Sequence, residues 1–494
     1  MLRISYAGKL IRSERAIHLS MIEWGISAGA HDAALTVVDG VEILFASHAE
    51  RYSGVKNDKH LNPDLIEAAL KFGRPENIHW YEKPRLRAMR RLLSGQGLTR
   101  FSAEKYLKSF GITAPIQYAN HHESHAAAGY YTSNFYTATA LVIDAIGEFD
   151  TASIWTCAGN EMKKQWSMDY PNSLGLFYSA ITDRVGLKPN EDEYILMGMA
   201  AYGDPDKYYW EMRELYEKTN LHRGCKWWMK KEDPDHYDLA ASAQKIYAEE
   251  FEKLLVRAKM KDTFQNNLVL SGGCALNCSA NHIARKYFDN IWIIPNPGDA
   301  GSSLGAIAAN NRRKLNWQGP YLGENIDTEY PVENLLTSLL KEGIVGVASG
   351  KAEFGPRAFG NRSLLADPSR LDIKDRVNEI KRRQKFRPFA PVILEQHAAE
   401  YFDMPVEVSP YMQFTARCKF PTKFPAIIHV DGTSRVQTVN EQQHPGLFEL
   451  LTRWYEETGC PMLLNTSLNI KGFPMVNNEK DAEMFQGLYN VKVF

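Results

Sequence analysis

The chain has 494 residues, of which 44% are hydrophobic and 24% are charged. This is an ordinary globular composition, and the length favours two or three domains over a single core. With a formal net charge of −1, the chain as a whole has no basic field that would attract nucleic acid or an anionic membrane.

The six cysteines are sparse and scattered, which argues against a disulfide framework and favours a reducing, cytoplasmic compartment. Cys274 and Cys278 have no second cysteine pair, so a zinc ribbon is not expected. No apolar run reaches the roughly 18 residues of a membrane span. Residues 1–20 are basic but lack a long apolar stretch. We interpret them as a leader or disordered arm, with a transit peptide as the alternative.

The first predicted elements form a hairpin. Residues 23–27 (EWGIS) are typical of a buried strand, and two further apolar runs flank the dipeptide Asp39-Gly40. Such a dipeptide between two apolar runs predicts a tight turn joining antiparallel strands. Asn62 followed by Pro63 then predicts the start of a helix that ends at Gly73.

The same pattern returns further along the chain. A strand ends at Asp144, an acidic loop and a second strand follow, and a turn at Gly159-Asn160 leads to a third strand. Two copies of this pattern indicate an internal duplication. Two such hairpins facing each other can hold a polyphosphate, which is the arrangement of the actin, sugar-kinase and Hsp70 superfamily.

A third stretch alternates strand, loop and helix. The strand at 267–270 leads through a glycine loop to a predicted helix at 274–288, and the strand at 291–295 leads to a helix at 302–311. This alternation predicts an α/β domain with ligands at the carboxyl ends of its strands. We place this domain at residues 21–325. After a stretch rich in Pro, Gly, Asn and acidic residues (315–332), we place a second α/β domain at residues 332–494.

Glycines in these loops allow backbone N–H groups to approach a phosphate closely, because they carry no side chain. Strand-to-helix turns also use glycine for purely conformational reasons, so the pattern has two explanations. The predicted nucleotide-binding residues are Gly147, Gly272, Gly273 and Asn277.

The stretch HHESHAAAGYY places three histidines at the start of a helix that Asn120 can cap. His121 and His125 are four residues apart and share a helix face, which suits two ligands of one cation. The zinc-protease pattern fails because His122-Glu123 is followed by a histidine only three residues from His122. A histidine pair at this spacing is also common on surfaces without any metal.

Two carboxylates strengthen the metal interpretation. Asp144 ends a buried strand beside a glycine loop, and Asp299 lies in a second glycine-rich loop at a helix start. Two imidazoles and two carboxylates form a mixed nitrogen and oxygen set that suits iron, zinc or manganese.

Many longer stretches carry a resemblance to a known family. They include GISAGAHDAALTVVDG, HAERYSGVKNDKH, HHESHAAAGYY, LVIDAIGE, EYILMGMAAYG, SGGCALNCSAN, PGDAGSSLGA, EFGPRAFGNRSLLADP, KRRQKFRPFAPVIL and NTSLN. The chain resembles the carbamoyltransferases of the nodulation-factor and antibiotic-tailoring type. These join a domain shared with the tRNA threonylcarbamoyl transferase to a YrdC-like domain.

The resemblance implies His121, His125, Asp144 and Asp299 as ligands of one transition metal, most often iron. It also implies that His31 is the base for an acceptor hydroxyl and that Lys56 holds a phosphate or carbonyl. From the residues alone, His31 is equally compatible with a simple turn residue, and Lys56 with a solvated lysine.

Basic and neutral polar residues cluster in the second domain. Arginine forks bind phosphate bidentately, and the pairing of K-x-R with S-x-N resembles the YrdC signature. A basic RNA-binding surface is the rival interpretation, which the overall charge disfavours. The predicted binding residues for carbamoyl phosphate and ATP are Arg357, Arg362, Lys381, Arg383, Arg387, Ser467 and Asn469.

The resemblance implies ATP-dependent transfer of a carbamoyl group from carbamoyl phosphate, through carbamoyl adenylate, to a hydroxyl of a small-molecule, sugar or nucleoside acceptor, with Mg²⁺ on the triphosphate. The alternatives are carbamoyl or threonylcarbamoyl transfer to tRNA or protein, a kinase or ATPase of the same superfamily, and a binding subunit without catalysis. The oligomeric state stays open, with a homodimer among the alternatives.

Overall fold

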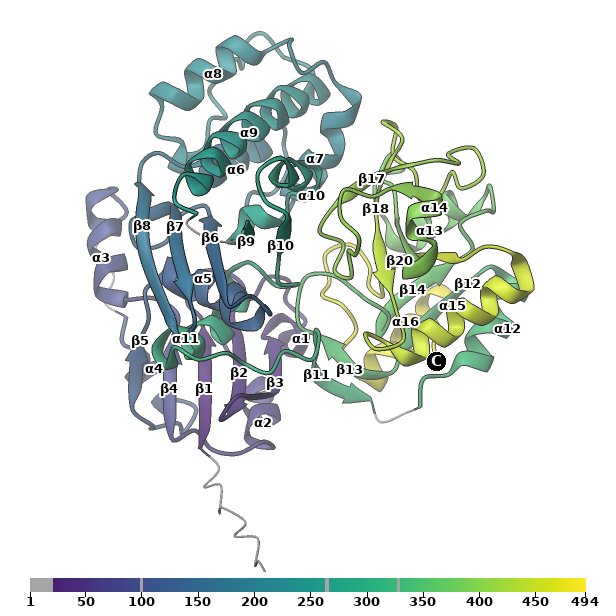
Figure 1. Ribbon diagram of the computed structural model, residues 1–494, viewed down its shortest axis with the longest axis horizontal. Helices are drawn as coiled ribbons and strands as arrows, with labels where there is room; N and C mark the ends of the chain where they lie inside the picture. Colours follow the sequence, from purple (N-terminus) through teal and green to yellow (C-terminus); the bar gives the residue numbers. More distant parts are fainter. Residues whose placement is uncertain (1–20, 98–100, 263–265, 327–328) are drawn as a thin grey trace, which may run out of the picture.

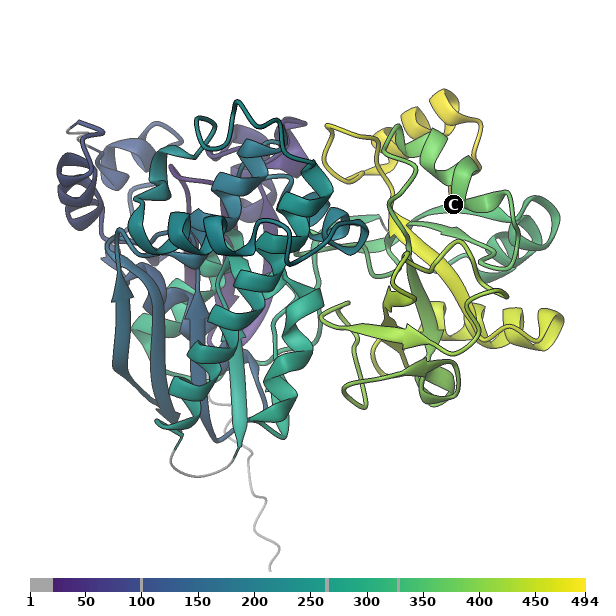
Figure 2. The ribbon, with the colours of Figure 1, turned by 90° about the horizontal axis from the view of Figure 1, so that it is seen from above.

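The computed structural model describes residues 21–97, 101–262, 266–326 and 329–494, which form two lobes (Figure 1). The N-terminal part of the chain forms one lobe and the C-terminal part the other, and Figure 2 shows the same division from above. The predicted leader arm, residues 1–20, lies outside the described residues. Among the described helices, none is both long and apolar enough to cross a membrane.

The first lobe contains two five-stranded mixed sheets of the same topology. Their strand orders are β3-β2-β1-β4-β5 and β10-β9-β6-β7-β8. In each sheet, three antiparallel strands are followed by two strands that run parallel to the first. The two sheets therefore share one strand topology, and an internal duplication stays a prediction. The strands are β1 (Ile22–Ser27), β2 (Ala34–Asp39), β3 (Glu42–His48), β4 (Asn77–Trp80), β5 (Ile116–Tyr118), β6 (Thr137–Ile143), β7 (Asp150–Ala158), β8 (Glu161–Asp169), β9 (Asn267–Ser271) and β10 (Asn290–Trp292).

Two helices, α5 (His121–Thr132) and α11 (Ser302–Asn311), form the layer between these sheets (Figure 1). Every residue of α5 except Glu123 is buried. A helix that is buried on all sides has no exposed polar face. Small residues, mainly alanine, form much of the surface of α5 that packs against its neighbours. The predicted helix start at His121 is correct, although its backbone N–H is bound by the carboxylate of Glu148 rather than by the side chain of Asn120.

Glycines allow close contact at each interface of this layer. A Cβ on Gly25 of β1 would lie 1.9 Å from a carbonyl oxygen of α11, and one on Gly305 of α11 would lie 1.9 Å from the carbonyl oxygen of Ser124 in α5. A Cβ on Gly129 of α5 would lie 2.4 Å from the side chain of Val269 in β9. Any larger residue would force the layers apart.

The outer helices cover the rest of the first lobe. The predicted single helix at 274–288 is wrong, because Asn277 has non-helical backbone angles and caps a new helix after a 3-10 turn at Gly273–Leu276. A second 3-10 turn at His282–Lys286 follows. The helices of this lobe besides α5 and α11 are α1 (Glu50–Ser53), α2 (Pro63–Leu70), α3 (Pro84–Leu93), α4 (Ala103–Lys108), α6 (Leu174–Arg184), α7 (Glu193–Met199), α8 (Tyr209–Lys218), α9 (His236–Lys259) and α10 (Cys278–Asn281).

The second lobe is built on a five-stranded mixed sheet with strand order β12-β14-β20-β15-β19 and an apolar core on each face. Residues 321–326, which lie in the predicted linker and at the end of the predicted first domain, form strand β11, which pairs with β13 of the second lobe. Its other elements are α12 (Val332–Glu342), β12 (Ile344–Ala348), β13 (Gly350–Glu353), β14 (Arg362–Ala366), α13 (Ile373–Lys381), β15 (Ala390–Leu394), α14 (Ala398–Tyr401), β16 (Phe402–Asp403), β17 (Thr415–Cys418), β18 (Thr433–Arg435), β19 (Gln437–Val439), α15 (Pro445–Thr458), β20 (Met462–Ser467) and α16 (Glu479–Tyr489).

Arg362 occupies the core of this lobe rather than a binding site. Its side chain is fully buried. The guanidinium donates to five backbone carbonyls, those of Glu324, Ser349, Gly350, Asn361 and Asn477. With its donors used in this way, Arg362 ties β11 and the C-terminal segment to β14. The sequence-based assignment of Arg362 to phosphate binding is corrected to a structural one.

We expect Gly305→Ala to destabilise the first lobe by about 2 kcal/mol, because the added methyl group overpacks the contact with α5. The matched control is Gly487→Ala in α16, where a Cβ meets nothing within 4 Å and removal of a helical glycine stabilises by roughly 0.5–1 kcal/mol. Thermal unfolding of both variants checks this. An unchanged unfolding midpoint for Gly305→Ala would show that the two helices have room to spare.

Candidate metal centre and active-site cavity

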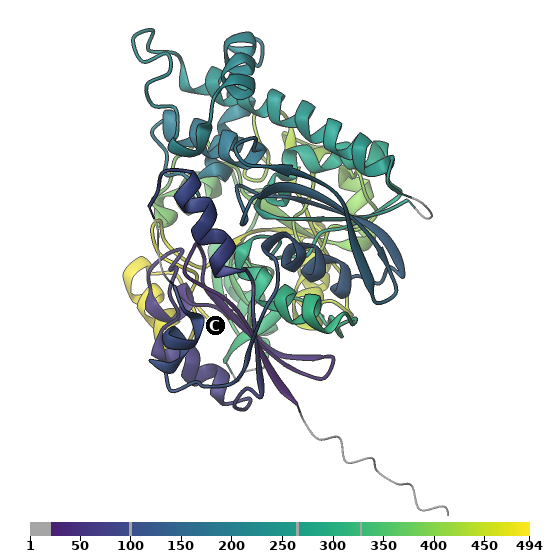
Figure 3. The same ribbon diagram turned by 90° about the vertical axis from the view of Figure 1, so that its left-hand side faces the viewer.

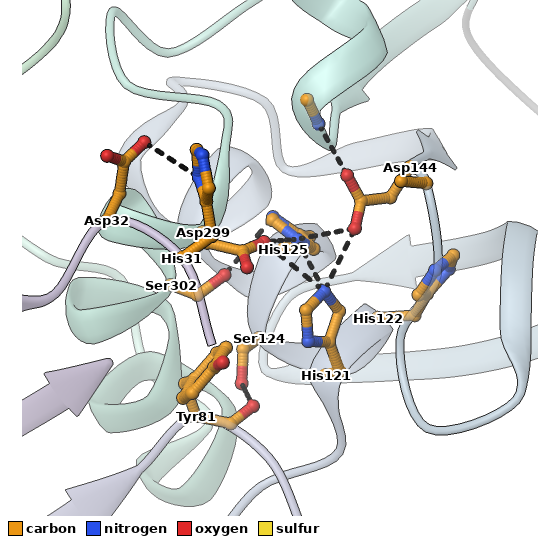
Figure 4. Close-up of polar contacts among 12 residues, drawn as sticks. His31, Asp32, Tyr81, His121, His122, Ser124, His125, Asp144, Asp299 and Ser302 are labelled. Carbon is orange, nitrogen blue, oxygen red and sulfur yellow. Dashed lines mark hydrogen bonds and ion pairs between the residues drawn. The ribbon is translucent and has the colours of Figure 1, made fainter. Parts of the chain in front are cut away.

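Four side chains from three distant parts of the chain converge at the N-terminal end of α5 (Figure 4). They are the predicted set His121, His125, Asp144 and Asp299, and their ligand atoms all lie within 4.8 Å of one another. His121 Nε2 lies 3.1 Å from Asp144 Oδ2 and 3.4 Å from Asp299 Oδ1. His125 Nε2 lies 3.9 Å and 3.3 Å from the same two oxygens.

Apart from the 3.9 Å separation of His125 and Asp144, these spacings fit one shared cation. Ligand atoms about 2.1 Å from a common ion lie roughly 3.0–3.5 Å apart in octahedral or tetrahedral geometry. The two Nε2 atoms of His121 and His125 lie 3.0 Å apart. Two imidazole lone pairs cannot face each other at this distance without a proton or a cation between them. Although burial opposes the shift, Asp299 and Asp144 raise the pKa of His121 to about 10, which shows how strongly this point favours positive charge.

Neighbouring groups hold the ligands in place. His125 Nδ1 forms a 3.1 Å hydrogen bond with Ser302 Oγ at the start of α11. The second oxygen of Asp144 accepts a 3.1 Å hydrogen bond from the backbone N–H of Gly273. Contacts of this kind orient metal ligands and fix which ring nitrogen faces the ion.

His122 differs from its two neighbours. Its Nδ1 forms a 2.8 Å hydrogen bond with Ser153 Oγ on β7, and the ring lies away from the cluster in Figure 4. Burial and the nearby His121 lower its pKa well below the ordinary value, so it is neutral. Position alone therefore separates the ligand pair His121 and His125 from the intervening histidine.

One cavity of about 1130 Å³ connects this cluster to the second lobe. Fourteen of the seventeen predicted site residues line its wall; the three that do not are His125, Gly272 and Arg362. His125 is still part of the metal cluster, behind the wall. Gly272 has φ +86° and its Cβ would lie 2.2 Å from a backbone oxygen, so its role is to make the turn.

His31 and Asp32 form a pair at the edge of the cluster. His31 Nδ1 lies 3.2 Å from Asp32 Oδ2, and His31 Nε2 is buried without a hydrogen-bond partner. Although burial opposes the shift, the hydrogen bond and charge of Asp32 raise the pKa of His31 to about 9. His31 lines the same cavity as the metal-cluster residues His121, Asp144 and Asp299.

The other predicted residues of the first lobe are already engaged. The N–H of Gly273 is bound to Asp144, and the side-chain amide of Asn277 exchanges two hydrogen bonds with that of Gln244, each 3.1 Å long. A Cβ on Gly147 would lie 3.0 Å from His122 and 3.1 Å from His121. Each of these three residues therefore has a structural role in addition to its position on the cavity wall.

The second lobe contributes a cationic wall. Lys381 Nζ donates to Ser467 and Asn469, and Ser467 Oγ donates to Asn469 Oδ1 at 2.7 Å, so the K-x-R and S-x-N segments meet. Burial and the neighbouring Arg383 and Arg387 lower the pKa of Lys381 well below its ordinary value.

The arginines of this wall are short of negative partners. Burial and the nearby Arg435 lower the pKa of Arg357 to about 9. Within the described residues, no carboxylate forms an ion pair with Arg357, Arg383, Arg387 or Arg435. Bound anions would relieve this repulsion.

Sequence reasoning missed Tyr194 and Arg435. The ring of Tyr194 on α7 lies 5.9 Å from Lys56 Nζ and is also faced by Arg357 at 5.8 Å and Arg387 at 4.7 Å. Tyr194 therefore joins cations from both lobes at the middle of the cavity. Its stretch EYILMGMAAYG is part of the family resemblance, which was the available signal, whereas Arg435 has no local motif.

Fold and site together define a two-lobed mixed α/β protein in which one cavity joins a His/Asp cluster of the first lobe to a basic wall of the second. Two family models match the chain: carbamoyltransferase N-terminus over residues 88–229 and 211–308, and carbamoyltransferase C-terminus over residues 336–493. The chain belongs to this carbamoyltransferase family, which includes nodulation proteins. That membership supports carbamoyl transfer from a donor to an acceptor.

Curated relatives agree with the family models. An uncharacterized protein of Synechocystis sp. is 32% identical, with 93% of each chain covered. Nodulation protein NolO of Bradyrhizobium diazoefficiens is 33% identical over 74% of this chain and 75% of its own. Nodulation protein U of Rhizobium fredii is 37% identical over 42% of this chain and 38% of its own.

We predict that the purified protein binds about one transition-metal ion per chain through these four ligands. His125→Ala and Asp299→Ala should each lower the metal content sharply, because each removes one of the four donors. Metal analysis by mass spectrometry after desalting measures the content. His122→Asn and the exposed His60→Ala are the controls and should keep the metal. Full retention by the His125 and Asp299 variants would refute the site.

We expect His31 in the metal-free protein to titrate near pH 9, and Asp32→Asn to lower that pKa because the charged acceptor is lost. Since folding raises this pKa, the stabilising contribution of His31 is complete below its unfolded value and disappears as the pH rises through about 9. Histidine chemical shifts measured by NMR across pH 5–10 provide the check, and a His31 pKa near the ordinary value for histidine in the parent protein would contradict it.

Proposed function

We propose that this protein is an ATP-dependent O-carbamoyltransferase. It would make carbamoyl adenylate from carbamoyl phosphate and ATP in the second lobe, and transfer the carbamoyl group to a hydroxyl of a small-molecule, sugar or nucleoside acceptor in the first. The observation that carries the proposal is the single cavity of about 1130 Å³ that holds both the His/Asp cluster and the cationic wall.

The chemistry assigned to the second lobe has two parts. Water cleaves carbamoyl phosphate to carbamate and phosphate, and a carbamate oxygen then attacks the α-phosphorus of ATP while pyrophosphate leaves. Arg357, Arg383 and Arg387 would neutralise the phosphate charge that develops, with Mg²⁺ on the triphosphate. Their lack of carboxylate partners among the described residues supports this role.

The network of Lys381, Ser467 and Asn469 would hold the carbamoyl group. Its amide, hydroxyl and ammonium groups lie together at one point of the cavity wall. These three residues belong to the K-x-R and S-x-N segments, on which the resemblance to YrdC-like domains rests. We therefore propose that the second lobe is YrdC-like.

In the first lobe, the geometry and donor types of His121, His125, Asp144 and Asp299 fit a transition metal, with iron the first choice and zinc or manganese the alternatives. A metal held there supplies Lewis acidity toward a carbonyl or phosphate oxygen. His31, in the neutral form that its pKa of about 9 makes the minor one at neutral pH, would accept the proton of the acceptor hydroxyl at Nε2 as the oxygen attacks the carbamoyl carbon and AMP leaves. Lys56 would hold the phosphate of the leaving AMP.

The reaction predicts its products. Carbamoyl phosphate added with ATP and Mg²⁺ should release pyrophosphate, and AMP should follow as the adenylate reacts with an acceptor or with water, whereas a kinase or ATPase would release ADP. Nucleotides and phosphates separated by ion-exchange chromatography show which pair forms. ADP release that does not depend on carbamoyl phosphate would rule the proposal out.

Single substitutions should separate the two half-reactions. We expect Arg387→Gln to reduce pyrophosphate release by about 10²-fold or more, because it removes a charge-assisted phosphate contact. His125→Ala should keep pyrophosphate release and lose carbamoylation of the acceptor, measured by mass spectrometry. Equal loss of both half-reactions in both variants would contradict the division of labour between lobes.

A further inference from the structure

One end of the cavity carries positive charge that the proposed reaction does not use. Its wall there includes Arg87, Arg90 and Arg91 from α3, and His222 from a 3-10 turn at Leu221–Arg223. α3 lies on the face of the first lobe that points away from the second lobe, as Figures 1 and 3 show. This group is therefore separate from the cationic wall assigned to carbamoyl phosphate and ATP.

Most of this charge has no carboxylate partner. Arg87 donates to Glu82 at 2.5 Å and to the carbonyl of Gly29 at 2.7 Å, so it is satisfied. Within the described part of the chain, Arg90 and Arg91 form no ion pair, and the buried Nε atom of each lacks a hydrogen-bond partner. Arg90 is only 7% exposed, and among the described residues its one side-chain hydrogen bond is a 3.4 Å contact to Gln96. A buried guanidinium with so few acceptors is costly unless an anion binds it.

Segments far apart in the sequence build this end of the cavity. Gln96 Nε2 lies 2.9 Å from His222 Nε2, and Arg223 donates to the carbonyl of Ser94 at 3.4 Å. Burial and the three nearby arginines, at 90, 91 and 223, lower the pKa of His222. The cationic residues are therefore gathered by tertiary contacts rather than scattered along one exposed helix.

The cluster lies beside the place where the acceptor hydroxyl must react. Gly29, whose carbonyl Arg87 binds, is two residues before His31. Glu82, the partner of Arg87, follows Tyr81, whose ring centroid is 5.3 Å from that of the metal ligand His121. Since His31, Arg90 and Arg91 all line the same cavity, one acceptor molecule could place a hydroxyl near His31 and another of its groups near α3.

We propose that Arg90 and Arg91 bind a phosphate group carried by the acceptor, so that the substrate is a phosphorylated hydroxyl compound such as a sugar phosphate or a nucleotide. Two guanidinium forks beside an imidazole suit a doubly charged anion with several oxygens better than they suit a neutral sugar. This inference rests on the proposed function and adds the substrate class of the same site.

Matched acceptor pairs test the proposal in the metal-loaded protein. The pairs are N-acetylglucosamine with its 1-phosphate and uridine with its 5′-monophosphate, and glucuronate tests for a carboxylate in place of the phosphate. We expect the phosphorylated member of at least one pair to be carbamoylated with a kcat/KM at least tenfold higher than its neutral partner. Faster carbamoylation of the neutral members would overturn the proposal.

Substitutions on α3 connect this preference to the arginines. Arg91→Gln and Arg90→Gln should abolish the preference for the phosphorylated acceptor, mainly through KM, and leave pyrophosphate release unchanged. The matched control is Arg85→Gln, an exposed arginine of the same helix that does not line the cavity. A preference that survives in both variants would place the acceptor phosphate elsewhere.

A direct measurement covers the case in which no compound of the panel is carbamoylated. Titration calorimetry with inorganic phosphate should show one binding event fewer in Arg90→Gln/Arg91→Gln than in Arg85→Gln. Equal phosphate binding in the two proteins would overturn the proposal. Failure of the carbamoyltransferase proposal itself has a different signature, the absence of AMP and pyrophosphate release in the parent protein.

Discussion

The site depends on how closely two buried helices approach each other between two sheets. Gly25, Gly305 and Gly129 lie at the three successive interfaces of this layer, and a Cβ at any of them would come within 2.4 Å of a neighbouring atom. Because α5 and α11 are held this close, the histidines at the start of one helix meet the aspartate that precedes the other. A wider spacing would leave the same four residues unable to share an ion. The small residues that follow the histidines in the sequence thus serve the same geometry as the histidines themselves.

The two parts of the cavity favour ligands of opposite charge. The His/Asp cluster raises the pKa of His121 to about 10 although burial opposes this, so it favours a cation. Burial and the neighbouring arginines lower the pKa of Lys381, so the second-lobe wall disfavours further positive charge. Buried charge of this kind lowers the stability of a protein without ligand, and it occurs mainly at sites that bind ligands. The fold tolerates it because extensive apolar cores lie behind both walls.

Local patterns predicted the local features of this structure. The hairpin at Asp39-Gly40 and the helix pair of histidines follow from turn chemistry and from the helical repeat, both of which depend on neighbouring residues only. The motif around Arg362 shows the limit of that reasoning. An arginine in a glycine-rich segment reads the same whether it binds phosphate or backbone carbonyls, and only the tertiary structure separates the two. The meeting of Arg90 with His222 is likewise set by packing between segments more than a hundred residues apart, which leaves no periodic signal.

Tyr194 shows why the two lobes form one site rather than two. Its ring, on the first lobe, is faced by a lysine of that lobe and by Arg357 and Arg387 of the second. An aromatic face attracts cations through its quadrupole, and it does so without adding the negative charge that would compete with a phosphate. The contact therefore holds the lobes together while leaving the arginines free for an anion. In the proposed reaction, carbamate and carbamoyl adenylate would react with water, so a short path through the cavity that both lobes share would protect the group in transit. If the two lobes separated freely, that protection would be lost while the carbamoyl group passes from the second lobe to the first.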